Sequence, residues 1–178
     1  MNIRKATVDD VKDISRIYAL SWKAAYVGMV PQDFLNAIDD DRWVQKFKKD
    51  IGDGTLSALM IFDGETPAGC AAFDAARDEK MQGWGEIVSI YLHPDYFGKG
   101  FGEALLGETV AALREQGYES VYLWVLRDNS RARRFYEKHG FAPNGDESTL
   151  EIMGKELVDV RYVSRQTERE EGTTKLSC

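Results

Sequence analysis

Three glycines occupy alternate positions in the chain: Gly98, Gly100 and Gly102. Of all the spacings in this sequence, theirs is the best suited to binding an anion. They follow an apolar stretch at residues 90–92 and precede an amphipathic stretch around Leu105. Glycine adopts positive φ angles and lets the backbone approach a ligand, so successive amides can converge on one anion. The helix that follows adds its positive N-terminal end. The glycine turn and the helix together predict a pyrophosphate site. A strand-to-helix connection that needs only small residues is the alternative.

A second segment, residues 128–141, decides between these interpretations. From Asn129 it reads Asn-x-x-Ala-x-x-Phe-Tyr-x-x-x-Gly-Phe, and it comes just after an apolar strand. The pairing of the glycine turn with this segment resembles the GNAT superfamily, the acyl-CoA-dependent N-acetyltransferases. The resemblance extends from about Ile3 to Val163, and its specific motifs lie within residues 86–141.

The resemblance implies that acetyl-CoA is the cosubstrate and that backbone amides hold its pyrophosphate. Two neighbouring parallel strands, ending at Leu92 and Leu126, would splay apart, so that the pantetheine arm pairs with the backbone of the first strand, which usually carries a bulge. Phe97 departs from the family pattern, which has Arg or Gln at this position. Lys99 offsets this change as a point charge, or else is a solvated turn lysine. The cofactor-binding residues that the resemblance implies are Ile90, Tyr91, Leu92, Gly98, Lys99, Gly100, Phe101, Gly102, Glu103, Asn129 and Tyr136.

Two side chains fit the proton transfers of a reaction in which an amine attacks the thioester directly. By resemblance, the Tyr136 hydroxyl donates a proton to the departing CoA sulfur; the alternative is a core tyrosine beside Phe135. By resemblance, Glu86 deprotonates the amine through water, and the alternative is a surface glutamate. Strand alternation indicates only that Glu86 faces away from Ile87. Glu86 and Tyr136 are therefore the expected catalytic residues.

The acceptor site is expected between the front helices and the strand that begins at Glu86. Trp22 and Tyr26 are the substrate-binding candidates together with Glu86. Each of these aromatics, like Trp43, is also a natural core residue at helical spacing. The aspartates at 39–41 either attract a cationic amine or favour the start of a helix.

The function predicted from these residues is transfer of an acetyl group to a primary amine of a small molecule, by direct attack in a ternary complex. A polyamine, an amino acid or another small amine fits this description. A non-catalytic acyl-CoA-binding or regulatory module on the same fold is one alternative, which the Phe97 departure supports. A protein N-acetyltransferase is the other. The presence of Glu86 and Tyr136 favours an enzyme.

The composition restricts partners and compartment. The chain has 178 residues, 43% of them hydrophobic, and a formal net charge of −7, which suits one globular domain and argues against a nucleic-acid partner. Cys70 and Cys178 are too few for a disulfide framework, and no apolar run indicates a signal peptide or a membrane partner, so a cytoplasmic location is expected. His93 and His139 lack metal-ligand spacing, so no metal is expected.

The elements that must position these residues predict an α+β fold. Their order predicts a mixed, mostly antiparallel sheet with helices on both faces, and the resemblance adds the splayed parallel strands. We expect one domain over residues 1–163 and a polar tail over 164–178, and the final strand allows a homodimer. Helices are expected at 7–26, near 31, near 43–47, around 105–113 and at 131–139; strands are expected at 2–6, 57–62, 67–75, 84–92 and 120–126, with a final pair over 141–163.

Overall fold

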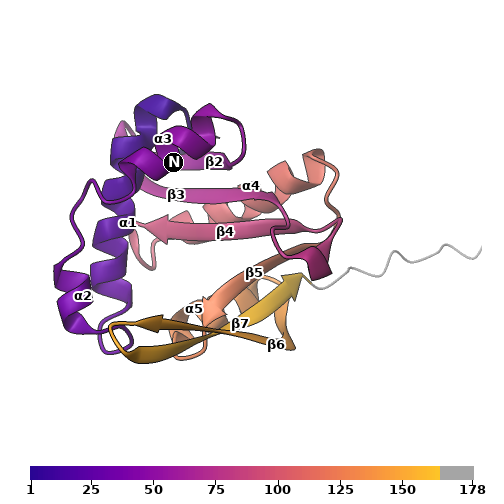
Figure 1. Ribbon diagram of the computed structural model, residues 1–178. Helices are drawn as coiled ribbons and strands as arrows, with labels where there is room; N and C mark the ends of the chain where they lie inside the picture. The colour runs from indigo at the N-terminus through magenta and orange to yellow at the C-terminus, as the bar shows by residue number, and fades with distance from the viewer. Residues whose placement is uncertain (165–178) are drawn as a thin grey trace, which may run out of the picture.

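Seven strands form one sheet in the computed structural model, which describes residues 1–164 (Figure 1). The strand order is β1-β2-β3-β4-β5-β7-β6, and within the described residues β4 and β5 are the one parallel pair. This confirms the predicted mixed, mostly antiparallel sheet. The predicted tail lies outside the described residues, apart from Ser164. The strands are β1 (Asn2–Lys5), β2 (Ser57–Asp63), β3 (Thr66–Ala75), β4 (Gly85–Leu92), β5 (Val121–Leu126), β6 (Phe141–Ile152) and β7 (Lys155–Ser164).

Helices cover both faces of the sheet, as Figure 1 shows. On one face, Leu105 and Leu113 of α4 pack with Leu123 of β5. On the other face, Ile14 of α1 packs with Met60 of β2. The helices are α1 (Val11–Ala25), α2 (Gln32–Asn36) and α3 (Val44–Gly52) on the second face and α4 (Phe101–Glu115) and α5 (Ser130–Lys138) on the first, with short 3-10 turns η1 (Val8–Asp10), η2 (Glu79–Met81) and η3 (Pro94–Tyr96).

The first helical segment begins where the sequence predicts it, at Thr7. The Thr7 hydroxyl accepts a hydrogen bond from the amide of Asp9 at 3.3 Å, and the Asp10 carboxylate accepts one from the amide of Thr7 at 2.8 Å. These two bonds form a capping box, which satisfies amides that have no partner inside the helix. The first turn is 3-10, and α1 then buries the apolar face expected from its spacing, namely Val11, Ile14, Ile17 and Tyr18.

A β-bulge and a splay shape the middle of the sheet. Ala72 of β3 pairs with Ser89, whereas the next residue, Phe73, pairs with Ile87, so Val88 is the extra residue of β4. The parallel pairing of β4 with β5 ends at Ile87 and Leu123. Beyond these residues the two strands separate, and the backbone of β4 faces an opening instead of a neighbouring strand. The bulge and the splay that the family resemblance implied are both confirmed.

Gly69 of β3 holds the strand against this part of β4, and its substitution gives a stability test. A Cβ atom at Gly69 would lie 2.9 Å from the carbonyl oxygen of Tyr91 and 2.3 Å from a methyl carbon of Leu92. Because a backbone atom is one of the two neighbours, we expect Gly69→Ala to lower the free energy of unfolding by about 1–3 kcal/mol. Urea unfolding measures this change.

A matched substitution in α4 controls for the change of residue type. Gly107 is exposed within the helix, and a Cβ atom there would meet nothing within 4 Å. We expect Gly107→Ala to stabilise the protein by up to about 1 kcal/mol, because alanine is the better helix former. Equal effects of the two alanines would contradict the close approach at Gly69.

Candidate active site

A cavity of about 880 Å³ lies in the splay between β4 and β5. It runs from the C-terminal end of α1, through the separated strands, to the glycine turn and the first turn of α5. One continuous cavity therefore joins the predicted cofactor residues to the predicted acceptor residues. The predicted residues that line it are Trp22, Tyr26, Glu86, Ile90, Tyr91, Leu92, Gly98, Gly100, Gly102, Glu103, Asn129 and Tyr136.

The glycine turn adopts the conformation that its sequence predicts. Gly98 and Gly100 have φ angles of 74° and 85°, and Gly100 is the residue from which α4 begins. The side chains of Lys99 and Phe101 are not part of the cavity wall. The ammonium of Lys99 lies 5.8 Å from the centroid of the Tyr96 ring, and Phe101 is buried in the core. Phe101 can thus offer a ligand only its backbone amide, and Lys99 offers its backbone amide at the turn.

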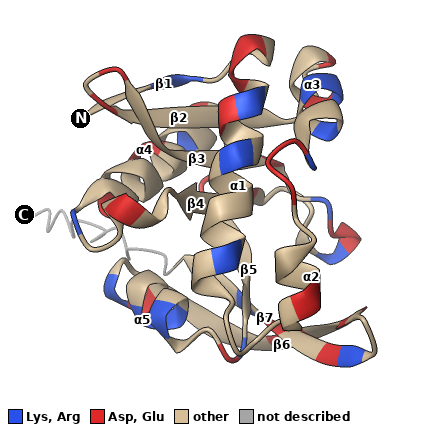
Figure 2. Cartoon of the chain, turned by 90° about the vertical axis from the view of Figure 1, so that its left-hand side faces the viewer, with Lys and Arg blue, Asp and Glu red and all other residues tan. Residues whose placement is uncertain are grey.

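Arg131 was missed by the sequence reasoning, although it lines the cavity. Its guanidinium carbon lies 4.2 Å from the centroid of the Phe97 ring, which also lines the cavity beside the glycine turn. Figure 2 shows further basic residues along α5, and a guanidinium suits bidentate pairing with phosphate. The guanidinium of Arg131 on α5 thus lies beside Phe97, the residue that departs from the family pattern.

Asn129 and Tyr136 approach the cavity from α5. The side-chain oxygen of Asn129 accepts a hydrogen bond from the amide of Ala132 at 3.1 Å, so Asn129 caps the helix. The Tyr136 ring packs against Phe135 and Phe141, with centroids 5.3 and 6.1 Å away. Its hydroxyl has no hydrogen-bond partner within residues 1–164, and burial raises the pKa of Tyr136. Tyr136 is therefore a protonated donor at the cavity wall.

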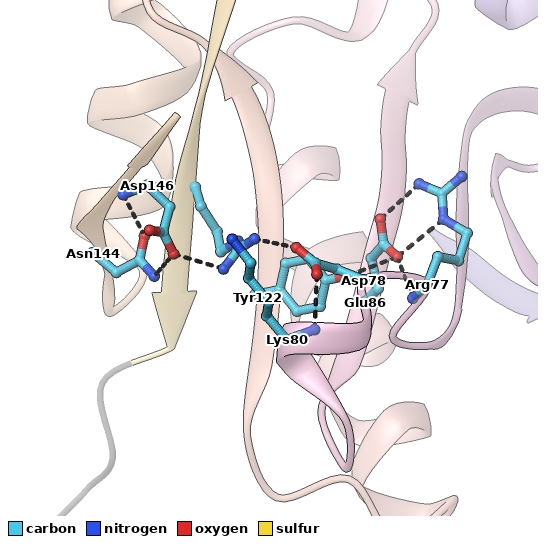
Figure 3. A network of polar contacts seen from close by, with 8 residues as sticks. Arg77, Asp78, Lys80, Glu86, Tyr122, Asn144 and Asp146 are labelled. Carbon is cyan, nitrogen blue, oxygen red and sulfur yellow. Dashed lines mark hydrogen bonds and ion pairs between the residues drawn. The ribbon is translucent and has the colours of Figure 1, made fainter. Parts of the chain in front are cut away.

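Glu86 is buried at 2% exposure, which contradicts a surface role. Its Oε1 accepts a hydrogen bond from the Arg77 guanidinium at 2.6 Å. Its Oε2 accepts three, from the Arg77 amide, the Arg77 Nε and the Tyr122 hydroxyl, at 3.1, 3.0 and 2.9 Å (Figure 3). Burial pushes the pKa of Glu86 upward, but the hydrogen bonds and the charge of Arg77 outweigh it, and the pKa lies below its ordinary value. Glu86 therefore favours the ionised carboxylate form.

Arg161 extends this polar network across β7. It is 4% exposed and forms ion pairs with Asp78 and Asp146, while its guanidinium carbon lies 4.6 Å from the centroid of the Trp124 ring. Figure 3 shows Asp78 and Asp146 on either side of the strands that carry this network. These contacts fix Trp124, which lines the cavity, and no sequence spacing indicated them.

The acceptor end of the cavity is aromatic and contains one further carboxylate. The Tyr26 and Tyr91 hydroxyls lie 3.2 Å apart, and the ring of Trp22 lies 4.8 Å from that of Tyr26. The Trp22 Nε1 is buried and has no hydrogen-bond partner within the described range. Asp159 of β7 lines the same end, and burial raises its pKa.

Other predicted acceptor residues lie elsewhere. Trp43 lines a smaller neighbouring cavity of about 280 Å³, which shares five lining residues with the large one: Trp22, Arg77, Val88, Ser89 and Tyr91. The aspartates at 39–41 are exposed and line neither cavity. In the part of the chain that the structure describes, no group of three metal-ligating side chains occurs, and no helix is long and apolar enough to cross a membrane.

Comparison with known proteins agrees with this geometry. Residues 14–141 match the acetyltransferase (GNAT) family. The chain is 29% identical over 163 residues to YuaI, an uncharacterised N-acetyltransferase of Bacillus subtilis, with 90% of each chain covered. It is 24% identical over 156 residues to a spermidine N(1)-acetyltransferase of Thermoplasma acidophilum, covering 87% of this chain and 96% of that one. The crystal structure of PaiA N-acetyltransferase from the same organism, in complex with coenzyme A, superposes with a TM-score of 0.74 at 21% identity, covering 93% of this chain and all of that chain.

Proposed function

The chain belongs to the GNAT family of acetyltransferases, and we propose that it transfers an acetyl group from acetyl-CoA to a primary amine of a small molecule, by direct attack in a ternary complex. The observation that carries this proposal is the continuous cavity between the glycine turn and the aromatic end of α1. Two substrates that enter it from opposite ends meet at the splay, next to Tyr136. Holding two reactants in this way supplies much of the rate of a direct transfer.

Backbone groups and one arginine hold the cofactor in this proposal. The pantetheine arm pairs with the backbone of residues 90–92, which has no strand beside it on the β5 side. The pyrophosphate lies on the amides of the glycine turn and the start of α4. Arg131, stacked on Phe97, adds a guanidinium at the same end. The loss of a charged side chain at position 97 is thereby offset.

The proton transfers use the two predicted side chains. Tyr136 donates its hydroxyl proton to the departing sulfur. Glu86 receives the proton of the amine through a water at Oε1, which accepts one hydrogen bond from protein where Oε2 accepts three. Because the pKa of Glu86 is low, its main contribution is a fixed negative charge that favours the ammonium-like transition state.

Calorimetric titration of the purified protein with acetyl-CoA and with free CoA tests the cofactor half of the proposal. We expect saturable binding of both, which weakens in Arg131→Gln. Lys48 is an exposed cation on α3, outside the cavity, and Lys48→Gln is the matched control that leaves binding unchanged. Absence of binding would contradict the proposal, and binding without transfer to any amine would favour the regulatory module. A cytoplasmic location and a homodimer remain predictions; the final strand, on which the dimer was expected, is β7, and it lies inside the sheet between β5 and β6.

A further inference from the structure

The acceptor end of the cavity contains a carboxylate that the proposed chemistry does not use. Four acidic side chains line the cavity: Glu86, Glu103, Asp128 and Asp159. Glu86 is paired with Arg77, while Glu103 and Asp128 are exposed, on α4 and directly before α5 respectively, at the cofactor end. Asp159 is half-buried on β7 at the other end. It is the acidic side chain that faces the acceptor without a compensating charge.

The strand register places Asp159 on the cavity face of β7. It pairs with Leu126 of β5 on one side and with Ser148 of β6 on the other, and both of these residues line the cavity. Its neighbour on the same face, Leu157, packs in the cluster that contains Trp22 and Tyr26. Within residues 1–164, Asp159 has no hydrogen-bond or ion-pair partner. The nearest cation on the strand, Arg161, is already paired with Asp78 and Asp146.

Asp159 lines the same cavity as Tyr26 and Tyr136. Burial raises the pKa of Tyr26, and the charge of Asp159 raises it further. Burial likewise raises the pKa of Tyr136, and Tyr26 raises it further. Burial is the one influence on the pKa of Asp159 itself. Asp159 therefore acts on Tyr26 and is not among the groups that act on Tyr136, so a cation that it binds need not be the nitrogen that attacks.

We propose that Asp159 binds a second, non-reacting cationic group of the acceptor, so that the preferred substrates are diamines or other amines with a second positive charge. This inference rests on the proposed acetyl transfer. A partly buried carboxylate without a partner is costly, and an incoming ammonium repays that cost with a charge-assisted hydrogen bond. The rings of Trp22 and Tyr26, which pack in the cluster that contains the neighbouring Leu157, suit a cation as well. Asp159 is in this view a specificity residue and not the base.

Steady-state kinetics with two amines of equal length test the inference. For the wild type we expect a higher kcat/KM with putrescine, a four-carbon diamine, than with butylamine. In Asp159→Asn we expect kcat/KM for putrescine to fall about 10- to 100-fold, mostly through KM, with butylamine unchanged. Glu156→Gln removes an exposed charge from the same strand and controls for the general attraction of cations; we expect it to change neither value.

Four results would overturn the inference. Equal losses for both amines would make Asp159 a base or a structural residue, and no loss for either would remove it from the site. A wild type that acetylates butylamine as well as putrescine would reject the second-cation subsite while leaving acetyl transfer intact, whereas a wild type that acetylates no amine would reject both.

A binding measurement separates recognition from catalysis. We expect putrescine to bind the CoA-loaded wild type in a calorimetric titration and to lose that binding in Asp159→Asn. Retained CoA binding by the variant shows that it is folded. Putrescine binding of equal strength in variant and wild type would overturn the inference.

Discussion

Replacing Tyr136 by Phe is expected to lower kcat about 100-fold, because a positioned general acid contributes at least this factor. The ring stays in its contacts with Phe135 and Phe141, so affinity for acetyl-CoA should change less than about threefold. The hydroxyl has no partner within the described residues, so its removal leaves no unpaired group behind. Pre-steady-state and steady-state kinetics at saturating substrates measure kcat, and calorimetry measures the Kd for acetyl-CoA.

The same variant distinguishes a catalytic hydroxyl from a packing role. Burial raises the pKa of Tyr136, so the wild-type phenol stays protonated and its own ionisation should not limit the rate at mildly alkaline pH. Tyr96 packs on Phe101 outside the cavity, and Tyr96→Phe is the matched control with unchanged kcat. Parallel losses of kcat, acetyl-CoA affinity and thermal stability in Tyr136→Phe would indicate that the residue serves packing alone.

Replacing Arg77 by Met is expected to destabilise the fold by about 2–4 kcal/mol at neutral pH, since it leaves the buried Glu86 charge uncompensated. We expect a loss in the lower part of that range, because the Tyr122 hydroxyl and the backbone amide of residue 77 still donate hydrogen bonds to the Glu86 carboxylate. The exposed pair Arg127 and Glu147 gives the control, because Arg127→Met removes a solvated partner and should cost less than about 1 kcal/mol. Urea unfolding measures both variants.

The pH dependence of this loss has a definite sign. In the wild type the pKa of Glu86 lies below its ordinary value, so its stabilising contribution is complete above the unfolded-state pKa and is lost as the pH falls through the folded-state pKa. In Arg77→Met, burial acts without the guanidinium and should raise the pKa of Glu86. The variant's deficit should then shrink as the pH is lowered from neutral to mildly acidic values, where its carboxyl takes up a proton. A deficit that is constant over this range would contradict the uncompensated charge.

Local sequence signals predicted the fold and the cofactor half of the site. The helix start at Thr7 and the positive φ angles of Gly98 and Gly100 each depend on residues within a few positions of one another. Such contacts are encoded by spacing. The splay and the bulge at Val88 came from the family resemblance, because no local pattern marks them.

The charged half of the site was not predictable in the same way. Glu86 was expected as an accessible base, but Arg77, from the segment after β3, holds it in an ion pair. Asp159 and Arg131 reach the cavity from β7 and α5, and their relation to it depends on strand order and helix docking. Partners that tertiary structure brings together leave no periodic trace in one sequence. The basic run in α5 was the one available hint of Arg131.

The most direct test of acetyl transfer is to incubate the wild-type protein with acetyl-CoA and putrescine, and to follow released CoA thiol together with the mass of the amine. We predict enzyme-dependent thiol release matched by an equal amount of putrescine that has gained one acetyl group. Thiol release without an acetylated amine would mean hydrolysis, and its absence with a panel of mono- and diamines, in a protein that binds acetyl-CoA, would contradict acetyl transfer to a small amine.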